Sequence, residues 1–303
     1  PKDWIPIQSI VVCCFIFLAF IMSQPLVSIL IPYKNTSAYL KECLDSILDQ
    51  TYTDWEVLAV DDYSTDDSYE IVSLYAQKDT RIKTYPNQGN GIIQALRTGY
   101  SKSKGSLITR MDSDDVMTPI RIRQMTMDLT QYGTGFLSVG QVTYFSEHGI
   151  SNGYERYEKW LNGLTAKGSN FSELYKECVV PSPCWIVHKI DFDSCGAFES
   201  ERYPEDYDLT FRFYALGLKI IPCNKVLLLW RDYDSRTSRT SAHYAQNYFF
   251  DIKLHYFLKL SREKERPLGL LGAGKKGKQI AQMRQNENIA FTWVCDNHNK
   301  IGK

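Results

Sequence analysis

Short apolar runs alternate with amphipathic stretches along the first third of the chain. Leu26–Pro32 is largely apolar and rich in β-branched residues, which is typical of a buried parallel strand. From Ser37 to Gln50 the apolar residues recur at helical spacing, and Thr36 or Ser37 can cap this helix. The same alternation predicts strands at Trp55–Val60, Ile82–Tyr85 and Leu107–Met111, and helices at Ser68–Ala76 and Asn90–Ser101. This order predicts an α/β protein with βαβ units and a mostly parallel sheet flanked by helices.

The pattern is looser after the predicted helix at Arg121–Tyr132. It predicts further strands at Phe136–Phe145, Trp185–His188 and Val226–Trp230, and helices at Tyr154–Leu164, Tyr207–Leu216 and Ser241–Leu260. From Pro267 an apolar strand runs into Gly272-Ala273-Gly274-Lys275-Lys276-Gly277, and Asp296 ends a second strand, which is the order of a dinucleotide-binding unit. Only one βαβ half follows, so we interpret this segment as truncated and Rossmann-like, without a working NAD site. The predicted units are residues 1–24, 25–240, a helical linker at 241–266, and 267–303.

The apolar run Ile10–Met22 has three interpretations: a signal-anchor, a signal peptide, or translated sequence upstream of a true start at Met22. A membrane-spanning helix needs about 20 apolar residues, and this run is shorter. It leads into the first strand without a linker, and a small-residue cleavage site is missing. We therefore favour the third interpretation and a cytoplasmic protein; a membrane anchor through residues 5–22 is the alternative.

Composition and charge narrow the function classes only slightly. A hydrophobic content of 44% and a charged content of 23% are those of an ordinary globular protein, and the formal net charge is zero. The eight cysteines form no C-x-x-C pair, which indicates reduced thiols rather than a zinc site. The stretch from Phe250 to Arg284 contains nine Lys and Arg residues and three Asp and Glu residues. That stretch can meet phosphates, or it can be an ordinary solvated helix face.

Two acidic clusters follow predicted strands, where ligands bind in parallel α/β sheets. Asp112 and Asp114 lie two residues apart, so both can approach one divalent cation, Mg²⁺ or Mn²⁺. Such a cation would hold the diphosphate of a nucleotide-sugar and assist its departure. Asp62, after an earlier strand, can accept the imide N–H of a uracil ring. The alternative for Asp112 and Asp114 is a solvated acidic loop, and the alternative for Asp62 is a capped turn.

A third acidic position precedes the helix predicted from Tyr207. Transfer of a sugar to a hydroxyl needs a base within hydrogen-bond reach of that hydroxyl. Asp206 can fill this role, and a helix N-terminus favours the charged form of its carboxylate. Ordinary helix capping by Glu205 and Asp206 is the alternative.

Four segments in this order resemble the motifs of family 2 glycosyltransferases. They are Val27 to Asn35, Trp55 to Asp67, Ile108 to Asp115, and Pro204 to Leu209. The resemblance implies the GT-A nucleotide-diphospho-sugar transferase fold and direct displacement with inversion. It implies that Asp112 and Asp114 hold the metal and the diphosphate, and that Asp206 is the catalytic base. It also implies a nucleoside pocket lined by Pro32, Lys34 and Asp62.

A narrower resemblance covers the later part of the chain. Arg156–Thr165, Leu227–Arg231 and the segment from Gly272 to Asp296 resemble the β-1,3-N-acetylglucosaminyltransferase-like proteins, as does Val116–Pro119 with Arg121 and Arg123. Members of that group act as tRNA-queuosine galactosyltransferases. The resemblance implies a UDP-galactose donor and queuosine in tRNA as the acceptor. A bacterial-type enzyme of cell-surface polysaccharide or glycolipid synthesis, acting on an acceptor glycan, is the alternative, and a non-catalytic sugar- or nucleic-acid-binding module is the alternative of another class.

Overall fold

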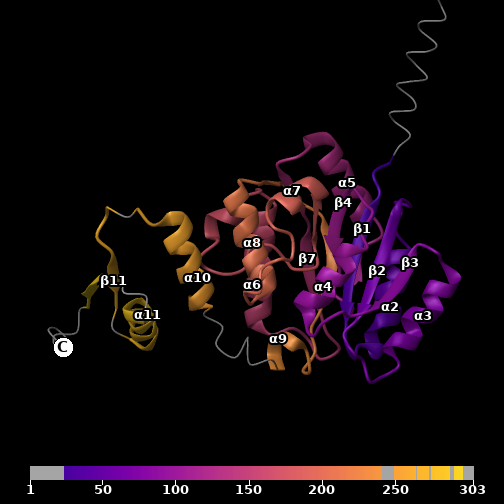
Figure 1. Cartoon of the computed structure of the whole chain (residues 1–303), viewed down its shortest axis with the longest axis horizontal. Helices are drawn as coiled ribbons and strands as arrows, with labels where there is room; N and C mark the ends of the chain where they lie inside the picture. The colour runs from indigo at the N-terminus through magenta and orange to yellow at the C-terminus, as the bar shows by residue number, and fades with distance from the viewer. Residues whose placement is uncertain (1–23, 241–248, 264, 273, 287–289, 296–303) are drawn as a thin grey trace, which may run out of the picture.

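The computed structural model describes residues 24–240, 249–263, 265–272, 274–286 and 290–295. Its centre is a seven-stranded sheet of order β3-β2-β1-β4-β8-β6-β9. Figure 1 shows β1, β2, β3 and β4 of this sheet among the helices that flank it. The four strands at one side of this order are parallel, and they are β1 (Val27–Tyr33), β2 (Trp55–Asp61), β3 (Ile82–Pro86) and β4 (Leu107–Arg110). The predicted α/β class and the mostly parallel sheet are therefore confirmed.

The other side of the sheet is mixed. Strand β8 (Trp185–His188) runs antiparallel to both β4 and β6 (Phe136–Val139). Strand β9 (Lys219–Ile221), which hydrophobicity did not predict, then pairs in parallel with β6. The strand order reaches β8 directly after β4, so the acidic cluster that follows β4 lies near the middle of the sheet.

Helices cover both faces of the sheet because its central strands are apolar on both sides. Helices α2 (Ser37–Leu48), α3 (Ser68–Lys78) and α5 (Arg121–Tyr132) contribute to one core with alternate residues of β1 and β2. Helices α4 (Ile92–Ser101), α7 (Lys189–Ser194) and α8 (Glu205–Leu216) contribute to the opposite core. Leu30 and Leu58 face the second core and Ile29 and Val57 the first, as strand alternation requires. The result is a three-layer arrangement.

A second sheet has the order β5-β10-β7, built from β5 (Val116–Met117), β10 (Val226–Arg231) and β7 (Gln141–Phe145). Its formation corrects the single strand predicted at Phe136–Phe145. That segment is two strands, β6 and β7, which belong to different sheets and are separated by Gly140. A Cβ atom at Gly140 would lie 2.7 Å from Leu227 Cβ and 2.8 Å from Cys184 Sγ. The chain therefore crosses between the sheets at a residue without a side chain, which the continuous apolar pattern concealed.

The remaining predicted elements begin and end within two residues of their predicted bounds up to β10, including α6 (Asn152–Thr165). The structure adds three short helices, η1 (Asn170–Glu173), α7 and α9 (Thr237–Thr240), and the short strand β5. Among the described residues, no helix has the length and apolar character needed to cross a membrane. The run Ile10–Met22 lies outside the described residues.

The described part of the helix predicted at Ser241–Leu260 is not one continuous α-helix. Residues 241–248 lie outside the described residues, and α10 (Phe250–Tyr256) is followed by a π-helical turn, η2 (Phe257–Ser261). Phe249 has a left-handed φ of 44°, so α10 starts after it. Further on, β11 (Gly269–Leu271), α11 (Lys275–Asn286) and β12 (Thr292–Val294) form the predicted βαβ unit with parallel strands. Asp296 lies outside the described residues.

Candidate active site

The two acidic clusters that the sequence singled out lie at the same edge of the main sheet. Asp62 follows β2, and the cluster Asp112–Asp115 follows β4. Strand β1 pairs in parallel with both, so the carboxyl ends of all three strands point to that edge. Pro32 lies near the end of β1, where it is paired with Val60 of β2. The topology therefore brings these residues together, as ligand sites in such sheets require.

Asp62 is held by the loop between β3 and α4. Its Oδ1 accepts hydrogen bonds from Asn87 Nδ2 at 2.6 Å and from the Gly91 backbone N–H at 3.0 Å. Its Oδ2 lies 3.5 Å from Lys34 Nζ, and the Lys34 side chain is largely exposed. One carboxylate oxygen is therefore fixed by the loop, while the other faces the exposed ammonium group of Lys34. This arrangement suits recognition of a polar N–H group of a ligand.

The loop after β4 is fastened to the end of β10. Arg231 donates from Nε to the carbonyl oxygen of Asp114 at 2.8 Å and pairs with Glu42. Its guanidinium lies over the rings of Tyr39 and Phe145, with the guanidinium carbon 4.9 and 4.4 Å from their centroids. These contacts restrict the conformation of the loop that carries the acidic side chains.

Three neighbouring carboxylates crowd this loop. Tyr233 donates its hydroxyl to Asp114 Oδ2 at 2.9 Å, and the Arg231 backbone N–H donates to Asp115 Oδ1 at 2.8 Å. Asp115 is fully buried, and its Oδ2 has no hydrogen-bond partner among the described residues. Burial raises the pKa of Asp114, and the charge of Asp112 raises it further. Burial and the charge of Asp114 likewise raise the pKa of Asp115.

Arg236 is a counter-charge to Asp114 and Asp115, because its guanidinium opposes the rise in the pKa of both carboxyls. It is 9% exposed, and its guanidinium lies over the Trp230 ring. Burial acts against its charge, yet the carboxylates of Asp115 and Asp114 together with Tyr144 raise the pKa of Arg236. The pKa values of Asp114 and Asp115 stay raised despite this guanidinium, so a further cation would stabilise their charged forms.

Arg110 joins the acidic loop to the start of α8. Its Nε donates to Asp112 Oδ1 and its Nη1 donates to Glu205 Oε1, both at 2.9 Å. The Arg110 side chain is only 7% exposed, so both ion pairs are shielded from water. Its fixed fork geometry suits two carboxylates at once. The segment that carries Asp112 and the segment that carries Asp206 therefore meet through one buried guanidinium.

Asp206 stands in the first turn of α8, next to Glu205. Its side chain is partly exposed, and its Oδ1 accepts the backbone N–H of Tyr207 at 2.8 Å. Burial, and next the charge of Glu205, raise the pKa of Asp206 to about 7, although the Arg110 guanidinium opposes the shift. A carboxyl with this pKa can take up a proton near neutral pH, as a general base must.

A pair of carboxylates is available for a divalent cation. Within the described ranges, no group of three or more His, Cys, Asp or Glu side chains is arranged to hold a metal ion. Mg²⁺ and ions like it are commonly bound by one or two protein carboxylates together with substrate phosphates. The mutual repulsion that raises the pKa of Asp114 beside Asp112 is also what a bound cation relieves. The donor set therefore fits a cation that arrives with a diphosphate.

Strand pairing places Pro32, Lys34 and Asp62 at the same sheet edge as Asp112 and Asp114, and Arg110 joins Asp112 to the start of the helix that carries Asp206. The structure adds other residues that the sequence did not indicate. Asn87 had a usable signal, because it directly follows β3, the neighbour of β2. No sequence signal pointed to a role in the site for Arg231, Tyr233 or Arg236. No motif spacing connects them to the acidic loop, which lies more than 100 positions earlier. Asp115, left without a metal role at the sequence level, instead holds the end of β10.

Comparison with known families agrees with this arrangement. The family model "Glycosyl transferase family 2" matches residues 28–196, more than half of the chain. The chain belongs to glycosyl transferase family 2. The matched region includes Asp62, Asp112 and Asp114, whereas Asp206 lies beyond its end. The sequence-level expectation of family 2 membership is therefore confirmed.

One curated relative of this family 2 protein is glycosyltransferase GlyA of Streptococcus pneumoniae. The two are 30% identical over 217 residues, which is 68% of this chain and 30% of GlyA. The chain thus spans less than a third of that relative. The similarity to GlyA does not show the narrower resemblance to queuosine galactosyltransferases.

Solved structures share the fold. Staphylococcus aureus TarS in complex with UDP-GlcNAc superposes with a TM-score of 0.58 at 17% identity, covering 88% of this chain and 73% of that one. The mannosyltransferase PcManGT of Pyrobaculum calidifontis, in complex with GDP-Man and Mn²⁺, gives 0.55 at 18% identity, covering 81% and 67%. The predicted GT-A fold is confirmed by these likenesses together with the family match.

Proposed function

We propose that this family 2 protein is a metal-dependent, inverting glycosyltransferase that uses a UDP-sugar. The observation that carries the proposal is the double ion pair of Arg110 with Asp112 and Glu205. It joins a carboxylate suited to a cation and diphosphate with the helix start that presents Asp206. A donor-binding half and an acceptor-activating half therefore meet at one edge of the sheet.

The donor half would use residues from three strand ends. Asp62 accepts the imide N–H of uracil, with Pro32 and Lys34 beside the nucleoside, and the carboxylates of Asp112 and Asp114 hold Mn²⁺ or Mg²⁺ with the diphosphate. A cation held by these carboxylates would neutralise charge that develops on the leaving diphosphate. The proposal is supported by the two solved structures of the same fold, which contain UDP-GlcNAc, and GDP-Man with Mn²⁺.

The acceptor half would centre on Asp206. Its carboxylate takes the proton of the acceptor hydroxyl while that oxygen attacks the anomeric carbon. The bond from the anomeric carbon to the diphosphate oxygen breaks, and UDP leaves with the bonding electrons. Attack opposite the leaving group inverts the anomeric configuration. Arg110 stays paired with Asp112 and Glu205, which keeps the base and the diphosphate site in register.

For the sugar and the acceptor, we propose galactose and queuosine in tRNA. This choice is supported by the resemblance of Arg156–Thr165 and Leu227–Arg231 to queuosine galactosyltransferases, and by the basic composition from Phe250 to Arg284. Synthesis of a cell-surface polysaccharide or glycolipid is the second candidate, favoured by the bacterial origin of GlyA. A non-catalytic binding module would not need the raised pKa of Asp206.

A donor panel tests the enzymatic proposal. With Mn²⁺ present, we expect the full chain to hydrolyse UDP-galactose faster than UDP-GlcNAc, UDP-glucose or GDP-mannose, measured by release of the nucleoside diphosphate. We further expect radiolabelled galactose to enter tRNA that contains queuosine, and not the same tRNA with guanine at that position. Turnover of another UDP-sugar without transfer to tRNA would favour the surface-glycan function, and no donor turnover at all would contradict the proposal.

A further inference from the structure

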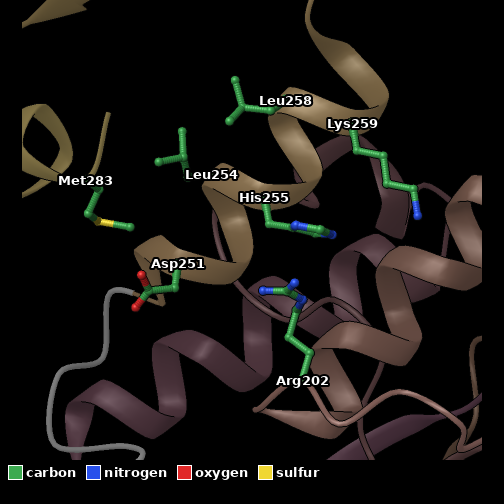
Figure 2. A pocket seen from close by; sticks show the side chains of 7 residues that line it. All are labelled: Arg202, Asp251, Leu254, His255, Leu258, Lys259 and Met283. Atoms are coloured by element: carbon green, nitrogen blue, oxygen red, sulfur yellow. The ribbon is translucent and has the colours of Figure 1, made fainter. Parts of the chain in front are cut away.

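A pocket of about 480 Å³ lies beside the start of α8, between α10, η2 and α11 (Figure 2). One end of it is basic. Arg202 reaches up from the loop before α8 toward the ring of His255 on α10, and Lys259 of η2 extends beside them. Among the described lining residues, Asp251, at the other end, is the acidic one. Two cationic side chains and an imidazole against one carboxylate favour an anion in this pocket.

Within the described ranges, Arg202 forms one long ion pair. Its Nε lies 4.0 Å from Asp208 Oδ1. The Asp208 carboxylate is also engaged by Arg212 Nε at 2.7 Å and by the Tyr256 hydroxyl at 2.7 Å. This long contact leaves the Arg202 guanidinium able to meet an anion in the pocket.

The rest of the lining is apolar. Leu254 and Leu258 project from α10 and η2, and Met283 approaches from α11 on the opposite side (Figure 2). A ligand that fits both ends would combine an anionic group with a flat or apolar group. The volume falls within the range of sites that hold small organic ligands, about 300–1,000 Å³. A nucleotide, with its phosphate and its base, has this chemistry and about this size.

The pocket lies one loop away from the proposed base. Arg202 and Tyr203 are neighbours in the segment that leads to Asp206. Arg202 lines the pocket, whereas the carboxylates assigned to the donor diphosphate are not among its described lining residues. The pocket is therefore separate from the diphosphate site, although Arg202 and Asp206 lie only four positions apart in the sequence.

We propose that this pocket binds a nucleotide of an RNA acceptor, with its phosphate on Arg202, His255 and Lys259 and its base against Leu254, Leu258 and Met283. The inference rests on the proposed function, because it names the second contact of the acceptor at the site of Asp206. A nucleotide anchored here places a neighbouring part of the same strand at the base. A lipid phosphate is less suited, because the apolar wall consists of three side chains and a lipid chain needs a longer groove.

Binding of a fluorescein-labelled single-stranded RNA oligonucleotide, followed by fluorescence anisotropy, tests the pocket. The double variant Arg202→Gln/Lys259→Gln should bind this RNA about tenfold more weakly, and the slope of log affinity against log salt should fall by about 0.7, the value for one phosphate contact on a single strand. The matched control is Lys78→Gln/Lys102→Gln, which removes two exposed charges at the ends of α3 and α4. It should bind the RNA like the parent.

Equal affinities for the parent and the pocket variant, or equal losses in the pocket variant and the control, would overturn the inference. So would a pocket variant that loses binding to phosphatidylglycerol vesicles and keeps its affinity for RNA, because the pocket would then take a lipid phosphate. Donor hydrolysis separates this test from the proposed function. The pocket variant should hydrolyse the UDP-sugar at the parent rate. If the parent protein does not hydrolyse any UDP-sugar, the proposed function is contradicted, and the RNA-binding result alone still tests the proposal for the pocket.

Discussion

Replacing Asp206 with Asn should lower sugar transfer by about 10²–10⁴-fold, the contribution typical of a general base. An amide has nearly the shape of a carboxylate but cannot accept the proton of the acceptor hydroxyl at neutral pH. The KM for the donor should stay close to the parent value, because Asp206 contributes no contact to the nucleotide in this account. Initial rates at saturating UDP-galactose, with the folded state checked by circular dichroism, measure the effect.

The pH profile supplies the control for this variant. Burial raises the pKa of Asp206 to about 7. The base works only when deprotonated, so parent activity should fall as the pH drops through that value and reach a plateau above it. The residual activity of Asp206→Asn should lack this step, while Asp49→Asn, a carboxylate-to-amide change at an exposed position, should keep the parent profile. A variant with parent-like rates would show that another group takes the proton.

Replacing Asp114 with Asn should lower donor turnover by about 10³-fold and remove its dependence on Mn²⁺. The change takes away a carboxylate from a pair that we assign to the cation, and with it several kcal/mol of charge stabilisation at the leaving diphosphate. In the parent, EDTA should abolish turnover and added Mn²⁺ should restore it. Titration of UDP by calorimetry, with and without Mn²⁺, should show cation-dependent binding in the parent and lose that dependence in the variant.

The matched control for Asp114 is Tyr233→Phe. This change removes only the hydroxyl that donates to Asp114 Oδ2. The loss of one such hydrogen bond to a charged group amounts to about 1.5–3 kcal/mol, so its effect should be smaller than that of Asp114→Asn and its Mn²⁺ dependence should persist. Equal turnover in Asp114→Asn and the parent, or full activity of the parent in EDTA, would contradict the assignment of the cation.

The first half of the fold was predictable because its signals are local. Apolar periodicity distinguishes β1 from α2 and β2 from α3, and the right-handed βαβ rule then places the strand ends together. Asp62, Asp112 and Asp114 follow strands directly, so the topology alone brings them to one edge. Their chemistry could therefore be proposed from residues that are distant in the sequence.

The second half depends on contacts that periodicity does not report. The break at Gly140 is set by the close approach of Leu227, in β10, and of Cys184, which directly precedes β8. The contacts of Arg231 and Tyr233 with the acidic loop exist only because β10 pairs with β5. Such strand pairings depend on the three-dimensional fold, and the spacing of these residues in the sequence does not predict them.

The anomeric configuration of the first product shows whether the sugar is transferred by direct displacement at a single site formed by the acidic strand end and α8. UDP-galactose carries an α-linked sugar, and its hydrolysis by the full chain with Mn²⁺ can be followed by ¹H NMR before the released sugar mutarotates. We expect β-galactose to appear first. If α-galactose appears first, the reaction proceeds with retention, and the role assigned to Asp206 is wrong.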